Sequence, residues 1–548
     1  MKIFKFCNKY IFKYKYLFIF YILLNIVIGL FGIITPLLTG KIIDNLTYIK
    51  SKEVLVNYCV LFAIISVINM LLGFLSSYIY IKLQTKSGYA LNKHVLEHLQ
   101  NVSILYFTNT DSVYLNQRIN NDSNTILIFC IGVIINIVVN TITLIFTSIL
   151  LVHINYKISI IMFVLVIIYI TAYSIFKKPL YLKSFKVKEA QSNFFSKLNE
   201  QLFNIKFIKV HSVKNIFIQR LDKSFDMLIK KLISSQKLSY LYTSCDLIIG
   251  LIAQLSIFLI GGFAIIDGKM TIGIYIVMAN YFSMLMNSSR YFFNLGKTYQ
   301  DNLVSYNRIS EILEVPEQKQ GNYEINYIES IKIKNLTFNY GEKNIYNNYN
   351  VEFKKGKIYG LIGRNGTGKS TLINLLLGLY INDYNGQISY NNIDIKEIDI
   401  YKTRLKNIGV TEQEPILIPD TLINNITLEK YYDINLIEKY INILGLDKYI
   451  LSLENGLNTV INEKSSNISG GEKQKISMLR MFIKNPEVMI FDEPTSALDV
   501  ESKEKFKNYI NSIKRNKIII IISHDSSIYD IYDEVIELNK FYPANSFY

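Results

Sequence analysis

KIYGLIGRNGTGKST, residues 357–371, fixes the architecture of the second half of this chain. A short apolar run typical of a buried strand leads into GRNGTGKST, which matches the phosphate-loop pattern G-x-x-x-x-G-K-[ST], and the helical TLINLLLGLY follows. Lys369 is placed to reach β- and γ-phosphate oxygens, and Ser370 can hold Mg²⁺. Three glycines let backbone N–H groups close around phosphates: Gly363, Gly366 and Gly368. The order strand, loop, helix predicts a phosphate-binding α/β domain.

Two acids at the end of a strand follow further along the chain. VMIFDE (488–493) is interpreted as a buried strand with the acids at its tip. Asp492 suits the ligand shell of a magnesium ion, and Glu493 is placed to polarise an attacking water as a general base. Short β-branched runs alternate with amphipathic helical stretches throughout this half. That alternation predicts an α/β domain with a mostly parallel sheet.

The first 300 residues carry a different pattern, six apolar stretches. Each is long enough for about 20 membrane-spanning helical residues. They lie near residues 16–38, 54–80, 125–151, 157–176, 247–266 and 270–290. The first is too long for the apolar region of a signal peptide and precedes further spans, so it is interpreted as the first transmembrane helix.

The positive charge of the chain lies beside these stretches. The net charge is +15, and the segment from Lys177 to Lys237 holds fourteen Lys and Arg against four acids. Because Lys and Arg mark the cytoplasmic side of a membrane protein, we expect a multi-pass protein of the cytoplasmic membrane with both termini in the cytoplasm. The inner membrane face accounts for the basic excess, so nucleic acid is not expected as a partner.

These patterns predict a multi-domain protein: a six-helix all-α transmembrane domain followed by an α/β P-loop NTPase domain. We place the transmembrane domain at residues 1–305, a polar linker at 306–327 and the nucleotide-binding domain at 328–548.

Three further motifs indicate a family. SNISGGEKQ (466–474), FDEPTSALD (491–499) and IIIISHD (519–525), behind the phosphate loop, resemble those of the ATP-binding cassette (ABC) transporters. The order of spans and cassette resembles a bacterial exporter-type half-transporter, and the resemblance covers nearly the whole chain. It implies ATP and Mg²⁺ as cofactors, and ATP hydrolysis coupled to transmembrane transport.

The resemblance also assigns roles outside the phosphate loop. Tyr340 matches the aromatic residue that stacks on adenine, Gln413 the glutamine between magnesium and the membrane domain, and His524 the histidine that contacts the γ-phosphate. Asp499 matches a loop residue that crosses the dimer. The implied catalytic set is Glu493, His524 and Gln413, and the metal-binding set is Ser370, Gln413 and Asp492. The implied nucleotide-binding set is Tyr340, Gly363, Asn365, Gly366, Thr367, Gly368, Lys369, Ser370, Thr371, Ser469, Gly470, Gly471 and Asp499.

The motif around Ser469 has a consequence for assembly. In the family, Ser469, Gly470 and Gly471 would cap the γ-phosphate of ATP bound to the phosphate loop of the opposite cassette. One chain has one of each half-site, so the resemblance implies a partner, either a second copy or a related half-transporter. Glu472 stands where glutamine is commoner. It is expected to be tolerated, because the backbone and the serine do the capping, yet it brings an acid near phosphate.

Three more segments resemble family parts that border the cassette. Residues 106–122 resemble the first cytoplasmic coupling segment, although Val113 replaces the usual glycine, and residues 199–212 resemble the second. TVINEK (459–464) resembles the exporter-specific loop beside the signature, with Glu463 in the family's acidic place. The coupling segments are expected to transmit closure of the cassettes to the membrane helices as rigid bodies.

The resulting hypothesis is an ATP-driven exporter whose cargo is a peptide, such as a bacteriocin, or a drug-like compound. A lipid flippase and an ATP-gated membrane sensor that transports nothing stay open as alternatives. Six apolar stretches argue against a soluble ABC ATPase that acts on nucleic acid. The lipid bilayer and the exported substrate are the expected partners besides the second half-transporter.

Two opposite charges lie at matching places in the last two spans. Asp246 lies 22 residues before Gly268, the centre of a DGK turn, and Arg290 lies 22 residues after it. Antiparallel helices would place both about 30 Å from the turn, near the inner boundary of the hydrocarbon. Three interpretations stay open: each reaches inner-face water, the two form a direct or water-bridged pair, or they serve a cavity for charged cargo.

If the two charges pair, Asp246→Asn and Arg290→Gln should each lower stability in detergent, because each leaves one charge without its partner. The double variant should then lose less than the sum of the two single losses. Thermal unfolding of the four proteins measures this difference. Strictly additive losses would exclude the pair.

Overall fold

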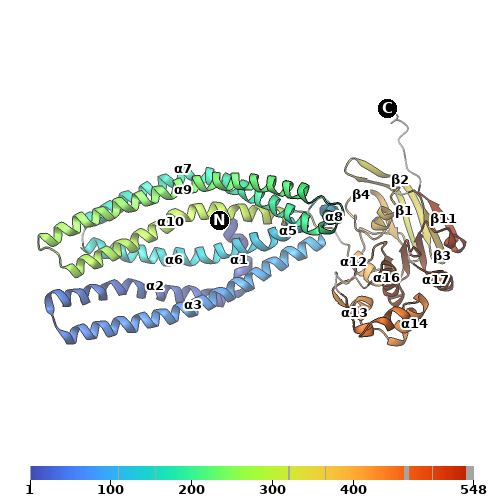
Figure 1. Cartoon of the computed structure of the whole chain (residues 1–548), viewed down its shortest axis with the longest axis horizontal. Helices are drawn as coiled ribbons and strands as arrows, with labels where there is room; N and C mark the ends of the chain where they lie inside the picture. The colour runs from blue at the N-terminus through green and yellow to red at the C-terminus, as the bar shows by residue number, and fades with distance from the viewer. Residues whose placement is uncertain are drawn as a thin grey trace, which may run out of the picture. The chain divides into compact units, whose positions relative to one another are not determined.

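The computed structural model describes residues 2–108, 110, 112–154, 156–318, 321–364, 366–461, 468–496 and 498–538. The chain divides into two compact units, which are drawn in Figure 1. The first comprises Met1–Val102 and Tyr106–Pro316, and the second comprises Ser103–Leu105 and Glu317–Tyr548. The first is helical, and the second combines helices with β-sheets.

Long helices joined by turns and short helices build the first unit. The long ones are α2 (Lys15–Asp44), α3 (Lys52–Asn101), α6 (Ser123–Ile154), α7 (Tyr156–Phe203), α9 (Lys214–Ile266) and α10 (Ile272–Leu313). The short ones are α1 (Lys2–Ile11), α4 (Ile104–Thr108), α5 (Ser112–Gln117) and α8 (Ile205–Val210). Figure 1 shows the long helices side by side, and α7 packs along α9 as α6 does along α10. Each apolar stretch expected from the sequence coincides with one long helix.

Apolar side chains cover much of the outer surface of these helices. Among the described residues, four helical segments are long and apolar enough to cross a membrane: Lys2–Ile49, Lys52–Asn101, Tyr114–Ile154 and Lys214–Ile266. In the segment that contains α3, only 6% of the apolar window is buried inside the protein. Such a surface needs an apolar surrounding, which a bilayer supplies. The expected spans in α7 and α10 are helical but are not among these four, so the count of six stays a prediction.

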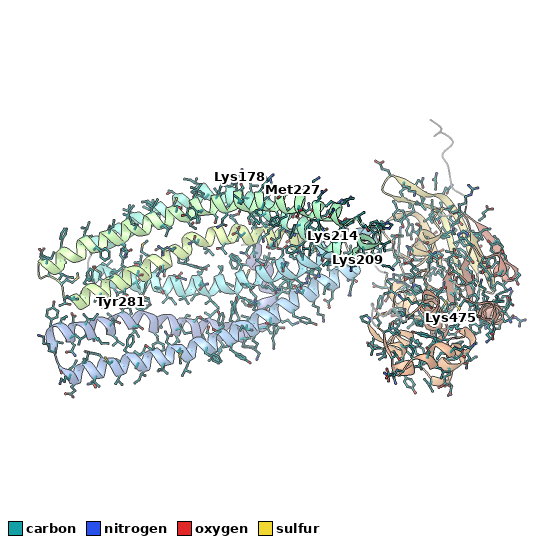
Figure 2. All side chains as sticks on the ribbon, viewed as in Figure 1. Lys178, Lys209, Lys214, Met227, Tyr281 and Lys475 are labelled. Atoms are coloured by element: carbon teal, nitrogen blue, oxygen red, sulfur yellow. The ribbon has the colours of Figure 1, made fainter. Side chains whose placement is uncertain are left out.

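Basic side chains gather toward one end of the helical unit. Figure 2 shows Lys209 of α8 and Lys214, the first residue of α9, near this end, whereas Tyr281 of α10 lies toward the opposite end. The Tyr281 hydroxyl donates a hydrogen bond to the carbonyl of Ile33 at 2.9 Å, which ties α10 to α2 there. Positive charge at one end of a bundle is the pattern of a membrane protein with that end in the cytoplasm.

Polar contacts fix α10 near both of its ends. Close to its N-terminus, the carboxylate of Asp44 at the end of α2 accepts a hydrogen bond from the N–H of Gly273 at 2.8 Å. Toward its C-terminus, the buried Arg308 pairs with the buried Asp122, with 3.1 Å between Nε and Oδ2. Asp122 ends the π-helical turn Arg118–Asp122. Such wide turns redirect side chains, and this one leaves the carboxylate buried beside the guanidinium.

A five-stranded parallel sheet forms the centre of the second unit. Its order is β11-β3-β10-β9-β6. The strands are β3 (Lys357–Ile362), β6 (Ile408–Thr411), β9 (Val488–Asp492), β10 (Ile518–Ile522) and β11 (Glu534–Glu537). The five isoleucines of β10 are each at most 1% exposed. A central strand covered on both faces needs such a continuous apolar run.

Helices cover the two faces of this sheet. Ile520 of β10 belongs to the same apolar cluster as Leu372 of α11 (Lys369–Leu376). Ile519 belongs to a second cluster that contains side chains of α16 (Gly470–Lys484) and α17 (Val500–Ile513). Adjacent residues of one strand thus face opposite helical layers, as the two-residue period of a strand requires.

A second, antiparallel sheet was not foreseen from the sequence. Its order is β2-β1-β4-β5, with β1 (Ser330–Tyr340), β2 (Lys343–Lys354), β4 (Tyr384–Tyr390) and β5 (Ile393–Asp394). The expected mostly parallel sheet therefore describes one of two large sheets. Strands β1 and β2 mix Lys and Asn with their apolar residues and are partly exposed, so no continuous apolar run marks them. The remaining elements are α12 (Ile400–Lys406), β7 (Asp420–Thr421), α13 (Leu422–Thr427), α14 (Ile434–Leu444), α15 (Asp447–Ser452) and β8 (Val460–Ile461).

Candidate nucleotide-binding site

Three loops of the second unit meet at the carboxyl edge of the parallel sheet. β10 lies between β3 and β9, and its register sets Ile522 opposite Leu361 on one side and Asp492 on the other. The phosphate loop follows β3, Glu493 follows β9 directly, and His524 is the second residue after β10. Side chains far apart in the sequence therefore come together where ligands bind in parallel sheets.

The phosphate loop needs glycine for its backbone. Gly366 and Gly368 have φ of +80° and +102°, values that residues with a Cβ rarely adopt. A Cβ at Gly368 would also lie 2.7 Å from Cγ2 of Ile345. Gly368 is the N-cap of α11, so the unpaired N–H groups of that helix start point into the loop. This geometry fits a bound phosphate.

Lys369 lies inside this loop. Its ammonium donates to the carbonyls of Gly363 at 2.5 Å and Arg364 at 3.3 Å, and its Nζ is 3.3 Å from Nε2 of His524. Burial lowers the pKa of Lys369, while the neighbouring Glu493 acts in the opposite direction. A partly desolvated ammonium attracts phosphate oxygens more strongly than one surrounded by water.

The two acids at the end of β9 lie near this ammonium. Burial, and then the adjacent Glu493, raises the pKa of Asp492. Oε1 of Glu493 is 3.8 Å from Nε2 of His524. A carboxylate whose ionised form is disfavoured by burial and by a neighbouring acid, as that of Asp492 is, gains from a nearby cation.

Glu493 is held in a strained backbone conformation. Its φ is +54°, in the left-handed region that a residue with a side chain rarely adopts. Its N–H donates to the carbonyl of Ile522 at 2.8 Å. Its carbonyl accepts from the Gln474 amide at 2.5 Å and from the Ser496 hydroxyl at 3.0 Å. Sequence reasoning missed this role of Gln474, although the residue ends the quoted motif SNISGGEKQ.

A cavity of about 410 Å³ unites these groups. The expected residues that line it are Tyr340, Gly366, Gly368, Lys369, Ser370, Thr371, Gln413, Asp492, Glu493 and His524. Lys343, Ile345 and Ile522 line it as well and were not foreseen; only the closeness of Lys343 and Ile345 to Tyr340 in the sequence could have indicated the first two. The expected metal-binding residues all line this cavity with oxygen-bearing side chains: Ser370, Gln413 and Asp492. Oxygen ligands are those that Mg²⁺ prefers, so this set fits the ion.

Part of the expected set lies outside this lining. Gly363 and Thr367 belong to the loop itself, where the Thr367 hydroxyl donates to the Arg364 carbonyl at 2.9 Å. The other expected residues that do not line the described cavity are Ser469, Gly470, Gly471 and Asp499. Asn365 and Glu463 lie outside the described residues.

Ser469 is the N-cap of α16. Its hydroxyl accepts from the N–H of Glu472 at 3.3 Å, and Oε2 of Glu472 accepts from the N–H of Ser469 at 2.6 Å. This reciprocal pair is a capping box, which glutamate and glutamine both complete. It explains why an acid fits here. The same oxygen accepts from the Ser469 hydroxyl at 2.5 Å, so both donors of Ser469 are engaged by a carboxylate.

Asp499 fixes the start of α17. Its Oδ1 accepts from the N–H of Ser502 at 2.8 Å, and its Oδ2 accepts from the Ser502 hydroxyl at 3.0 Å. Lys475 of α16 approaches Oδ2 to 3.5 Å. These contacts, led by the bond from the Ser502 backbone, lower the pKa of Asp499 to about 2. The carboxylate stays ionised at neutral pH and anchors the loop between Glu493 and α17.

Comparisons with known proteins agree with this geometry. The family model of the ABC transporter transmembrane region matches residues 18–289, and the ABC transporter model matches residues 346–496. The chain belongs to the ABC transporters and joins both parts as a half-transporter of the exporter type. Its cassette is an ATPase that couples ATP hydrolysis to transport, and the chain is a multi-pass membrane protein.

Individual relatives cover nearly the whole chain. The leukotoxin translocation ATP-binding protein LktB of Mannheimia glucosida is 28% identical over 542 residues, which are 96% of this chain and 75% of that protein. LktB of Bibersteinia trehalosi is 27% identical over 542 residues, which are again 96% of this chain and 75% of that protein. A solved structure of a bacterial Atm1-family ABC exporter with ATP bound matches with a TM-score of 0.85 at 18% identity. It covers 95% of this chain and 93% of that one, and shows that the two share a fold.

Glu472→Gln should lower the ATP concentration needed for half-maximal hydrolysis severalfold. The amide keeps the cap of α16 but removes a negative charge beside the Ser469 donors. ATP titrations of phosphate release by the full-length protein measure this change. Glu472→Ala is the control for lost capping: it keeps the Ser469 N-cap but loses the reciprocal hydrogen bond of the capping box, so it should lower stability. An unchanged or higher half-maximal concentration in Glu472→Gln would show that the carboxylate does not oppose phosphate.

Proposed function

We propose that this chain works as a dimer, with a second copy or a related half-transporter, that uses ATP to export cargo across the cytoplasmic membrane. The dimer is inferred from one observation: the residues expected to bind ATP fall into two separate groups. Most of the set lines one cavity, whereas Ser469 begins α16 and is not part of that lining. A second chain would bring its own Ser469 to this cavity. The termini and both cassettes would lie in the cytoplasm, the side on which Lys and Arg flank membrane spans.

Within each half-site, the chain's own groups divide the chemistry of ATP hydrolysis. Lys369 and the N–H groups of the phosphate loop hold the β- and γ-phosphate oxygens. Glu493 takes the proton of the water whose oxygen bonds to the γ-phosphorus, while the bond from that phosphorus to the bridging oxygen breaks and ADP leaves. His524 contacts the γ-phosphate. Mg²⁺ held by Ser370, Gln413 and Asp492 would neutralise phosphate charge when bound.

The backbone of Glu493 supports this assignment. Strained conformations cluster at functional sites when the surroundings hold them in place. The hydrogen bonds from Gln474 and Ser496 and to Ile522 do so here. They fix the start of the side chain that has to meet the water, which favours a base of defined position.

We favour a toxin or peptide as the cargo. The relatives that match along nearly the whole chain are named for leukotoxin translocation, and those names support toxin or peptide export over lipid flipping.

Glu493→Gln should bind ATP but hydrolyse it at least about 100-fold more slowly, because general-base catalysis contributes roughly 10²–10⁴-fold. Phosphate release and ATP binding by the full-length protein in proteoliposomes separate the two effects. Glu501→Gln is a matched control, since it removes a carboxylate of α17 whose side chain is 79% exposed. Near-normal turnover in Glu493→Gln would overturn the role of the base.

Mixed dimers test whether Ser469 serves the opposite cassette. Lys369→Ala and Ser469→Ala should each abolish most hydrolysis when alone. In a mixed dimer of the two variants, one site would join the intact phosphate loop of one chain with the intact Ser469 of the other, so hydrolysis should return. Copurification with two different tags isolates the mixed dimer. No recovery would mean that each chain caps its own nucleotide.

A further inference from the structure

A buried tyrosine of the antiparallel sheet contacts the phosphate loop. The hydroxyl of Tyr346 on β2 donates a hydrogen bond to the carbonyl of Gly368 at 2.8 Å. Tyr346 is 3% exposed, and its ring belongs to the same apolar cluster as Leu372 of α11. It is not among the residues that line the nucleotide cavity. Its hydroxyl therefore reaches the loop from the core and not from the side of the nucleotide.

The carbonyl of Gly368 accepts hydrogen bonds from two donors. The N–H of Leu372 lies 2.8 Å from it and makes the first helical hydrogen bond of α11. Tyr346 is the second donor, and a carbonyl oxygen has a lone pair for each. Burial raises the pKa of Tyr346, so the hydroxyl keeps its proton and donates throughout the neutral pH range.

The planar peptide bond carries this restraint into the phosphate loop. The carbonyl of Gly368 and the N–H of Lys369 belong to one trans peptide unit, in which they point in opposite directions. A carbonyl held toward Tyr346 therefore directs the Lys369 N–H away from the tyrosine. That N–H is one of those that the start of α11 leaves unpaired, and such groups bind phosphate oxygens.

Gly368 is the residue that makes such a restraint useful. Its φ of +102° favours glycine, and a Cβ there would lie 3.0 Å from the Tyr346 hydroxyl oxygen. The missing side chain lets the hydroxyl approach, but it also leaves the backbone with more conformations than any other residue allows. The hydrogen bond from Tyr346 selects one of these conformations.

We propose that Tyr346 is a positioning residue of the nucleotide site, whose hydroxyl holds the peptide unit between Gly368 and Lys369 in its phosphate-binding orientation. The inference rests on the proposed nucleotide site and adds a residue that does not touch the nucleotide. Bound phosphate would itself hold the Lys369 N–H, so the hydrogen bond matters most before ATP binds. Its loss lowers the fraction of loops that are ready to bind, and the apparent affinity falls by the same factor.

Tyr346→Phe tests this role, because it removes one oxygen atom and keeps the ring. The full-length protein in phosphatidylcholine nanodiscs should show a KM for MgATP and a Kd for MgADP about three- to tenfold higher, the effect of one hydrogen bond. The kcat should stay within about twofold, since a loss of binding common to the ground and transition states raises KM alone. Phosphate release gives KM and kcat, and the rise in melting temperature with MgADP gives Kd.

Two neighbouring tyrosines provide matched controls. The ring centroid of Tyr349 on β2 lies 5.1 Å from that of Tyr346, and its buried hydroxyl has no hydrogen-bond partner within the described part of the chain. Tyr349→Phe should therefore keep the wild-type KM. The Tyr380 hydroxyl lies 2.8 Å from that of Tyr340, so Tyr380→Phe removes a hydrogen bond away from the loop. It should keep the affinity for inorganic tripolyphosphate, which has no adenine, whereas Tyr346→Phe should weaken that affinity about three- to tenfold.

The contrary outcomes are distinct. An unchanged KM and an unchanged Kd for MgADP in Tyr346→Phe would overturn the positioning role, even with a lower melting temperature, because the bond would then only stabilise the fold. An equal rise in KM in Tyr349→Phe would attribute the effect to a loosened sheet and overturn the role as well. A lower kcat at constant KM would also contradict it. A wild-type protein that does not bind MgADP would instead contradict the proposed nucleotide site.

Discussion

The parallel pairing of β10 with β3 and β9 is the constraint on which the nucleotide site depends. It sets the ends of three strands at one level, so the phosphate loop, Glu493 and His524 start from a common edge. Burial on both faces holds this register, because Ile519 and Ile520 belong to the clusters on opposite sides of the sheet. A slip of one residue would exchange these two faces. The site geometry therefore follows from the apolar core beneath it.

Helix α16 connects the two functional ends of one cassette. Ser469 begins the helix, and Gln474, little more than one turn later, holds the carbonyl of Glu493. A left-handed backbone costs about 1–3 kcal/mol for a residue with a side chain, and the hydrogen bonds of Glu493 to Gln474, Ser496 and Ile522 offset this cost. The start of α16 and the Gln474 hydrogen bond form a short covalent and hydrogen-bonded connection from Ser469 to Glu493. The residue expected to serve the opposite nucleotide is thus linked to the base that serves its own.

The sequence predicted those segments of the nucleotide site in which the chemistry requires particular residue types at a particular spacing. The phosphate loop, the two acids after β9 and the His524 loop are of this kind, and the structure brings them to one cavity. Strands β1 and β2 escaped prediction because their polar, partly exposed residues carry no apolar run. The bond from Gln474 to Glu493 escaped it because it joins segments 19 residues apart. Counting residues could set Arg290 and Asp246 at matching positions of two helices, but the close approach of Arg290 to Gly250 depends on how α9 and α10 face each other. The side chain of Asp246 lies outside the described residues, so its pairing with Arg290 stays a prediction.

Helix α10 is continuous and carries both Arg290 and Arg308, the arginine of the buried ion pair. Arg290 and Arg308 are 18 residues apart, hence about 27 Å along the helix. Arg308 is fixed by Asp122 at one end, and Gly273 is fixed by Asp44 at the other. Breaking a buried ion pair leaves an uncompensated charge and costs about 3–5 kcal/mol, so modest forces leave that contact in place. The part of α10 that carries Arg290 therefore lies between two polar anchors, and bending between them is the motion that preserves both contacts.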